Sequence, residues 1–276
     1  MNLGPSVTTG QRAASIGLRV FGLLFCLYLV GPIFVFVPLS FNDVALFHYP
    51  IEHFSLKWFR ELLVSHDWRR ALLNSLFVAT TSTLLATLLG VCAAFGLWRG
   101  RFPGKNLIMI IIMTPMIVPT VISAVGMYFA FARAGLDNTY LALILAHTAL
   151  ATPMVVITVS AVLARFDGNL LRAAANLGAH PLLAFRRVML PLILPGVVAG
   201  AIFAFAISFD DVVAALFIAG PTQRTLPVQM YMQASDLYDL VIAAAATFML
   251  MVAISLMAAL EFLKRRNKFS NRSGAH

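Results

Sequence analysis

The sequence predicts an all-α membrane protein with six transmembrane helices and both termini in the cytoplasm. Its 276 residues are 61% hydrophobic and only 11% charged, whereas a soluble domain is about half apolar and about a quarter charged. The charges stand in short clusters, and the uncharged runs between them reach the length of about 20 residues that spans a bilayer. Because these runs show no two-residue alternation, helices rather than barrel strands satisfy their backbone polar groups.

Six runs are long enough to cross the membrane, and we expect them to form one transmembrane domain over residues 1–276. The first run is longer than the apolar core of a signal peptide, about 7 to 15 residues, and no small-residue cleavage site follows it, so we expect it to be retained. The expected helices cover about residues 16–39, 71–98, 106–132, 138–164, 188–218 and 239–262.

A short outer segment between the first two runs predicts a helix that lies on the membrane interface. In FSLKWFRELL, which starts at Phe54, the apolar residues share one helical face. Tryptophan is enriched at the boundary between lipid and water, so Trp58 is the expected anchor of this helix.

Lysine and arginine gather on one side of the predicted topology. Cytoplasmic segments of membrane proteins carry the excess of these residues. Here they occur before the first helix, at Arg99, Arg101 and Lys105 after the second, and in the C-terminal tail. The formal net charge of +9 therefore reflects the orientation of the helices in the lipid bilayer. We expect no nucleic-acid partner.

Two pairs of prolines interrupt the third and fifth expected helices. Each proline removes a backbone donor, so we expect both helices to be kinked. Small residues at Gly196 and Gly200 would let another helix approach the fifth helix closely. The proline pairs are Pro115 with Pro119 and Pro191 with Pro195.

The longest cytoplasmic loop, residues 165–187, predicts two short helices that meet at a bend. Asp167 or Asn169 can cap the first helix, Gly178 stands where a left-handed residue ends it, and Pro181 suits the first turn of the second. Alanines at 173–175 present almost no side chain, so a partner could approach closely. Either a docking surface or a plain connecting loop with a basic flank would fit this composition.

The same loop resembles a family motif. Its pattern is similar to the EAA loop of binding-protein-dependent ABC importer permeases, and the strings PLSFN, FSLKWF and FDDVVAALFIAGPTQRTLP resemble the spermidine/putrescine-type group, in particular its PotC-like members. One position departs from the family, because Arg172 stands where a glutamate usually precedes the two alanines. The matching positions are Ala173, Ala174, Leu177, Gly178, Ala179 and Phe185.

The resemblance implies the type I (MetI-like) importer permease fold in the bacterial inner membrane. It also implies that Arg172 and the matching positions couple to a separate ATPase, which would bind ATP and Mg. The implied partners are a sister permease, two copies of the cytoplasmic ATPase and a periplasmic solute-binding protein. The implied solute is a polyamine or a similar small organic cation, and an amino-acid-like, opine or phosphonate solute is the alternative.

No catalytic site or cofactor is expected in this chain. A phosphate-binding loop needs the pattern GxxxxGK[ST], and the nearest string, GRFPGKN at 100–106, has one residue too few and ends on Asn106. Of the six histidines only His147 falls in a membrane run, where a helix–helix hydrogen bond is the more common role. Cys26 and Cys92 have no metal-site spacing. A stand-alone secondary transporter, the other class that we considered, would show inverted repeats, and the sequence has none.

Asp210 and Asp211 are the candidate membrane carboxylates of the expected fifth helix, and such groups are costly enough to suggest a function. They follow Pro191 by 19 residues, about 28 Å of helix, which places them toward the outer end of the fifth helix. Adjacent residues project about 100° apart, so one of the two is expected to face a solute path. An acidic gate for a cation and a hydrated helix end are the two interpretations.

Overall fold

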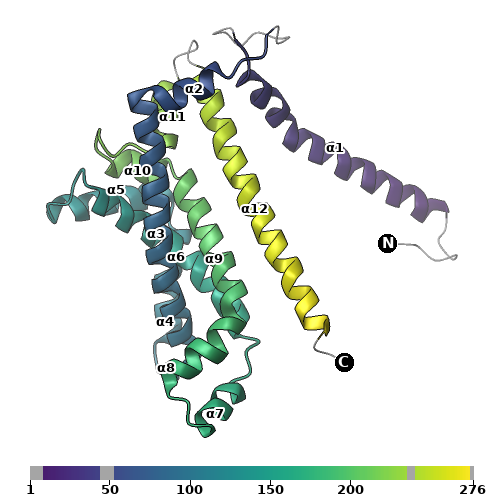
Figure 1. Cartoon of the computed structure of the whole chain (residues 1–276), viewed down its shortest axis with the longest axis vertical. Helices are drawn as coiled ribbons and strands as arrows, with labels where there is room; N and C mark the ends of the chain where they lie inside the picture. The colour runs from purple at the N-terminus through teal and green to yellow at the C-terminus, as the bar shows by residue number, and fades with distance from the viewer. Residues whose placement is uncertain (1–8, 44–52, 235–239, 274–276) are drawn as a thin grey trace. The chain divides into compact units, whose positions relative to one another are not determined.

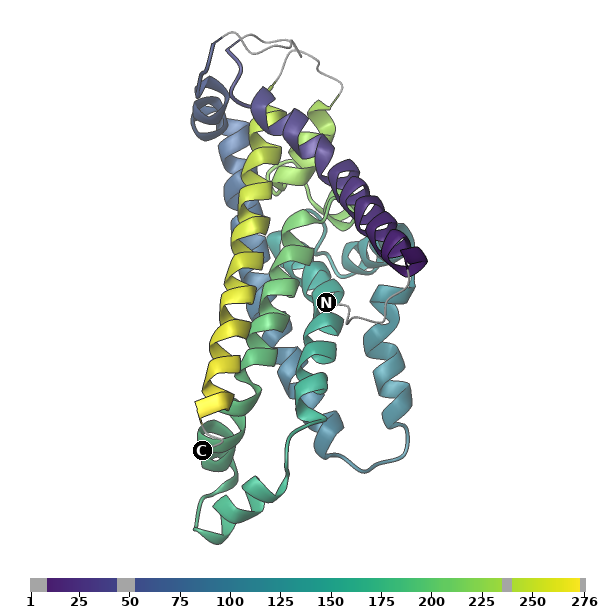
Figure 2. The same cartoon turned by 90° about the vertical axis from the view of Figure 1, so that its right-hand side faces the viewer.

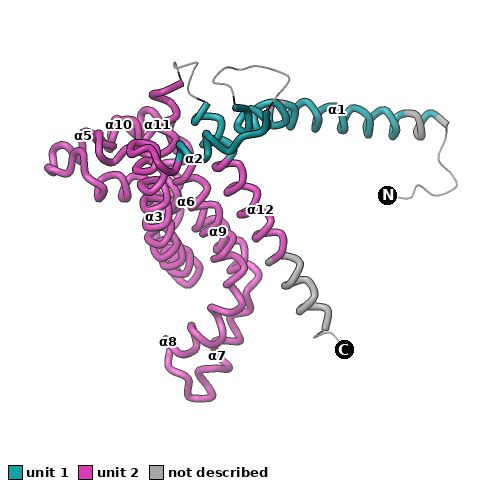
Figure 3. Tube along the Cα trace, turned by 45° about the horizontal axis from the view of Figure 1, so that its top comes forward, with its two compact units in different colours: residues 1–62, 236–247 teal, residues 63–235, 248–276 magenta. Residues whose placement is uncertain are grey.

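The computed structural model describes residues 9–43, 53–234 and 240–273. The chain divides into two compact units, residues 1–62 with 236–247 and residues 63–235 with 248–276 (Figure 3). Within the described residues, five helices are long and apolar enough to cross a membrane, and one bent helix pair brings the number to six. The all-α membrane fold is therefore confirmed, while a single permease domain over residues 1–276 stays a prediction.

The first unit contains α1 (Thr9–Leu39) and most of the short helix α2 (Lys57–Val64). The indole Nε1 of Trp58 donates a hydrogen bond to the carbonyl oxygen of Asn42 at 2.8 Å, and the rings of Phe41 and Phe54 stack at 4.9 Å. The predicted short helix is confirmed. The prediction that Trp58 anchors this helix at the membrane interface is wrong, because Trp58 is only 7% exposed and its indole nitrogen is hydrogen-bonded inside the protein.

Three long helices, α3 (His66–Arg99), α6 (Tyr140–Leu163) and α9 (Leu190–Asp210), pack side by side in the second unit (Figures 1 and 2). Glycines bring their backbones close together. A Cβ atom on Gly90 of α3 would lie 2.6 Å from the Cβ of Val155, and one on Gly200 of α9 would lie 3.1 Å from the Cα of Val155. The prediction that Gly196 and Gly200 admit another helix is confirmed, and that helix is α6.

Two apolar clusters fill the spaces between these helices. Toward the outer ends of α3 and α6, Val78 and Leu143 pack with Ala215 of the short helix α10 (Val213–Ile218). Toward the inner ends, Val159 and Ile193 belong to a second cluster. Dispersion contacts rather than the hydrophobic effect hold helices together in lipid, so this tight packing carries the stability of the unit.

The predicted third helix, 106–132, consists of two helices, α4 (Lys105–Ile117) and α5 (Thr120–Arg133), which are bent by 106°. Val118 has an extended backbone between them, and Pro119 precedes the first turn of α5. A proline disfavours the helical conformation of the residue before it. The prediction of a single kinked helix is therefore wrong here, since α4 ends at Ile117, two residues before Pro119, although Pro115 is accommodated within it.

The predicted fifth helix, 188–218, is also divided. It begins with a π-helical turn, η1 (Phe185–Met189), continues as α9 and stops where the backbone of Asp211 becomes extended, before α10 starts. The proline ring at position 191 would meet the carbonyl of Arg187 in a regular helix, and the wider π turn gives that ring room. Two further helices, α11 (Leu226–Gln233) and α12 (Val241–Ser273), follow α10 in the chain.

Replacing Gly200 with alanine is expected to destabilise the second unit by about 1–3 kcal/mol, a range typical of overpacked cores. The new Cβ would lie 2.5 Å from Oγ1 of Thr158 and 3.1 Å from a backbone atom, so α9 would have to move away from α6. Unfolding in detergent micelles measures the loss. Gly126→Ala in α5 is the matched control, because nothing lies within 4 Å of a Cβ there. Equal midpoints for the two variants would contradict the close-packing account.

Candidate functional site

The longest cytoplasmic loop forms two short helices that meet at a bend, and we call residues 167–184 the elbow. Its first arm is α7 (Asn169–Asn176), where the carboxylate of Asp167 accepts a hydrogen bond from the backbone N–H of Asn169 at 2.9 Å. Gly178 ends this arm with φ +84°, which confirms its predicted left-handed conformation. The N–H groups of Gly178 and Ala179 bond to the carbonyls of Ala175 and Ala174, the Schellman arrangement that closes a helix end.

The second arm is α8 (Pro181–Ala184), in which Pro181 occupies the first helical position as predicted. The tip between the arms presents small and apolar groups. Leu177 is 89% exposed and Leu182 is 60% exposed, and Ala173 is exposed beside them. A surface of this kind is unusual for a simple connecting loop, because exposed apolar side chains in a cluster mark contact surfaces.

Aromatic rings fix the base of the elbow to the inner end of α3. The ring of Phe185 meets that of Phe95 edge-on at 5.5 Å, and Phe166 meets Trp98 in the same way at 5.5 Å. Pairs with this geometry contribute about 0.5–1.5 kcal/mol beyond their buried area. Phe185 is half-buried in this contact, so it supports the elbow from within, while the tip faces outward.

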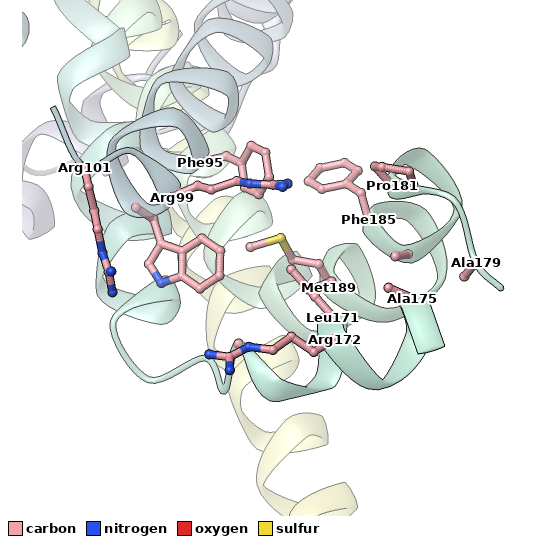
Figure 4. Close-up of a pocket in the computed structure, with 13 residues that line it drawn as sticks. Phe95, Arg99, Arg101, Leu171, Arg172, Ala175, Ala179, Pro181, Phe185 and Met189 are labelled. Carbon is pink, nitrogen blue, oxygen red and sulfur yellow. The ribbon is translucent and has the colours of Figure 1, made fainter. Parts of the chain in front are cut away.

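A pocket of about 500 Å³ opens between the inner end of α3 and the elbow (Figure 4). Arginines at 99, 101 and 172 line it together with aromatic and small side chains, and no carboxylate does. The structure thus brings Arg172 together with Arg99, the last residue of α3, and with Arg101 of the cytoplasmic loop that follows. The remaining lining residues are Phe95, Trp98, Gly168, Leu171, Ala175, Ala179, Pro181, Ala184, Phe185 and Met189.

The two candidate carboxylates of the solute path have different surroundings. Asp210 is exposed at the last position of α9 and lines two hollows, of about 490 and about 270 Å³. Asp211 is directed into the protein, where one carboxylate oxygen accepts a hydrogen bond from the N–H of Ala215 at 3.1 Å and stabilises the start of α10. The predicted divergence of the two side chains agrees with these contacts.

A buried polar chain connects Asp211 to the three central helices. The same oxygen of Asp211 lies 3.6 Å from Nε2 of His147, whose Nδ1 is 2.7 Å from the hydroxyl of Ser208. Ser208 is in turn 2.9 Å from the hydroxyl of Ser82. His147 is 1% exposed, and its role as a helix–helix hydrogen-bonding group is confirmed. The chain ties α6, α9 and α3 together beside the point where α9 stops.

Comparison with known proteins places the chain in a family. Residues 86–269 match the binding-protein-dependent transport system inner membrane components. The chain belongs to this family. It is a permease subunit of an ABC importer and a multi-pass protein of the bacterial inner membrane, so the alternative of a stand-alone secondary transporter is wrong.

Relatives of this permease span most of its length. The spermidine/putrescine transport system permease protein PotC of Escherichia coli (strain K12) is 32% identical over 238 residues, which cover 86% of this chain and 90% of PotC. The molybdenum transport system permease protein ModB of Mycobacterium bovis (strain ATCC BAA-935 / AF2122/97) is 35% identical over 217 residues, 73% of this chain and 81% of ModB.

A solved structure confirms the permease fold. A chain of a bacterial ABC transporter involved in the import of the acidic polysaccharide alginate superimposes with a TM-score of 0.72 at 15% sequence identity. The match covers 95% of this permease and 99% of that chain. The likeness shows the type I permease architecture and carries nothing on the solute.

Sequence reasoning missed a polar clamp at the outer end of the permease. The side-chain amide of Asn74 donates to the carbonyl oxygens of Thr222 and Arg224 at 3.0 and 2.8 Å, and its oxygen accepts from the hydroxyl of Tyr140 at 2.8 Å. Ser75 accepts from the N–H of Leu226 at 2.7 Å. These bonds hold the loop before α11 on α3.

A sequence signal for these residues did exist. Asn74, Ser75 and Ser82 interrupt a long apolar run, and polar groups inside a span usually bond to neighbouring helices. Ser75 and Ser82 are seven residues apart and so share a helix face. For metals, no group of three or more His, Cys, Asp or Glu side chains that could hold an ion lies in the described ranges 9–43, 53–234 and 240–273.

Replacing Ser208 with alanine is expected to lower the free energy of unfolding by about 1–3 kcal/mol, because buried polar groups would lose their partner. Nδ1 of His147 and the hydroxyl of Ser82 both lie within 2.9 Å of Ser208 and are both buried. Reversible unfolding in mixed micelles measures the change. Ser255→Ala in α12 is the control, since that exposed hydroxyl bonds within its own helix. A loss no larger than that of the control would show that the polar chain contributes nothing.

Proposed function

We propose that this permease forms half of a solute channel and couples it to ATP hydrolysis through the elbow. A sister permease would complete the channel, two copies of a cytoplasmic ATPase would bind ATP and Mg, and a periplasmic binding protein would deliver solute. This chain itself would carry no cofactor and no enzymatic activity. The observation that carries the proposal is the elbow, a rigid exposed surface at the cytoplasmic end of α9.

The geometry of the elbow supports docking in three ways. The Schellman closure at Gly178 fixes the angle between its arms, so little conformational entropy is lost on binding. Alanines in α7 let another backbone come near, and the exposed leucines supply apolar area. The aromatic base ties these features to α3, so a movement of the tip would be passed to the membrane helices.

Arg172 supports a partner surface adapted to this chain. Its side chain is exposed on α7, where the family usually has glutamate. An arginine at an interface pairs best with planar acceptors such as carboxylates or backbone carbonyls. The ATPase of this transporter would therefore carry an acceptor opposite Arg172.

We also propose that the solute is a polyamine or a similar small organic cation. The exposed carboxylate of Asp210 beside two hollows on α9 supports a cationic solute, since a negative charge in a confined site attracts cations more strongly than in bulk water. The relative PotC, a spermidine/putrescine permease by name, supports the same class. An amino-acid-like, opine or phosphonate solute is the alternative, because a relative named for a different solute, the molybdenum permease ModB, is also 35% identical over 217 residues.

Replacing Gly178 with valine tests the coupling proposal. A β-branched residue at φ +84° is strained by about 1–3 kcal/mol, which would change the angle of the elbow. We expect a folded permease whose transporter loses at least about tenfold of its solute-stimulated ATP hydrolysis, a factor that corresponds to about 1.4 kcal/mol. Purified transporter in liposomes gives the measurement. Ala173→Trp, at an exposed position, should do the same by blocking close approach.

Gly104→Val is the matched control for this experiment. Gly104 also has a positive φ, +86°, lies in the other cytoplasmic loop and has nothing within 4 Å of its Cβ position. It should carry similar strain and leave the stimulation of ATP hydrolysis near the wild-type value. Wild-type stimulation in both Gly178→Val and Ala173→Trp would exclude the elbow as the coupling surface.

Asp210 and Asp211 are expected to differ in transport. Asp210→Asn removes the exposed charge and keeps the shape, so uptake of a cationic solute should fall by about tenfold while uptake of a neutral one changes little. Asp211→Asn keeps an oxygen that can accept from the N–H of Ala215, so its effect should fall on stability. The measurement is the rate of solute uptake by each variant at matched expression. The affinity of the binding protein for the solute is measured separately. Equal transport by Asp210→Asn and the wild type would remove the chemical support for a cationic solute.

A further inference from the structure

The pocket under the inner end of α3 has a lining of one charge sign. Arg99, Arg101 and Arg172 line it, and Figure 4 shows Arg101 and Arg172 across the pocket from Pro181 and Ala179. We propose that this pocket binds the phosphate headgroup of an anionic phospholipid of the inner leaflet, such as phosphatidylglycerol. The site is separate from the solute path and does not depend on which solute is carried.

The charge of the pocket requires an anion. Arginine only donates hydrogen bonds, and its planar group binds phosphate oxygens in pairs. None of the three arginines forms an ion pair with a carboxylate of the described residues, so their charges repel one another without compensation. A phosphate bound by Arg99 and Arg101 would offset this repulsion and accept several charge-assisted hydrogen bonds, which leaves the guanidinium of Arg172 for an acceptor on the ATPase.

The position of the pocket favours a lipid as the source of that phosphate. Arg99 is the last residue of α3 and directly follows the uncharged run 71–98, so it lies where the hydrocarbon ends and the headgroups begin. Basic pockets at the cytoplasmic ends of membrane helices are a known form of anionic lipid site. Leu177 and Leu182 at the tip of the elbow are not among the residues that line the pocket, whereas Arg172, Ala175 and Ala179 of the elbow are.

The apolar part of the lining argues for an amphiphile over free phosphate. Phe95, Trp98, Phe185 and Met189 share the pocket with the arginines, and its volume of about 500 Å³ far exceeds that of a phosphate ion. A soluble phosphate would leave these side chains facing water. The glycerol and upper acyl groups of a phospholipid would cover them, because such chains carry apolar surface next to the charged head.

Native mass spectrometry of the full-length permease in detergent tests the proposal with phosphatidylglycerol and phosphatidylcholine as probes. We expect retention of phosphatidylglycerol but not of phosphatidylcholine. The double variant Arg99→Gln/Arg101→Gln should bind phosphatidylglycerol about thirtyfold more weakly, since each arginine near a membrane surface contributes a factor of about five. Arg172 is left unchanged, so that the result is independent of ATPase docking.

The matched control is Arg186→Gln/Arg187→Gln, two exposed cytoplasmic arginines that do not line the pocket. This control should bind phosphatidylglycerol as strongly as the wild type does. Arg99→Lys/Arg101→Lys keeps the charge, so its affinity for phosphatidylglycerol should lie between those of the wild type and the glutamine variant. It replaces the glutamine variant in the test if that variant folds poorly. Equal loss in the control, equal retention in the glutamine variant, or displacement of the lipid by glycerol phosphate would each overturn the proposal. Loss of the lipid when the ATPase assembles would also overturn it, because the occupant would then be the ATPase.

Discussion

The close approach of α6 to α3 and α9 is the constraint on which the rest of the second unit depends. In lipid, apolar side chains gain little by leaving the solvent for another helix, so helices associate through packing and a few hydrogen bonds. Glycines at 90, 196 and 200 allow that packing. Only at this spacing can Ser82 on α3 reach Ser208 on α9 and can His147 on α6 reach both Ser208 and the region of Asp211.

Much of the architecture could be predicted because it depends on local chemistry. The length of the apolar runs defines the spans, and the arginines and lysines define the topology. The elbow could be predicted as well, since a glycine with positive φ and a proline in a first turn leave few alternatives for the backbone. Gly196 and Gly200 indicated a close helix contact without revealing which helix makes it.

The remaining features depend on contacts that sequence spacing does not contain. Pro119 predicts an interruption, but the angle of 106° between α4 and α5 depends on how each half packs. Trp58 has the character of an interfacial anchor and is buried because the carbonyl of Asn42 is available to it. Asp210 and Asp211 look equivalent in the sequence. They differ because α9 ends between them, which turns one carboxylate toward Ala215 and leaves the other exposed.

The continuity of α9 has a mechanical consequence. Its 21 residues span about 31 Å between the π turn at the elbow and Asp210. Pro195 lacks a backbone donor, but beyond it successive turns of α9 are hydrogen-bonded, so this part of the helix would transmit a rotation as a stiff rod. A rotation at the cytoplasmic end would swing the carboxylate at the far end through a similar angle. The π-helical turn η1 is the part of this segment where the backbone can most easily twist. A change in its hydrogen-bond register would therefore determine how far the carboxylate at the outer end moves.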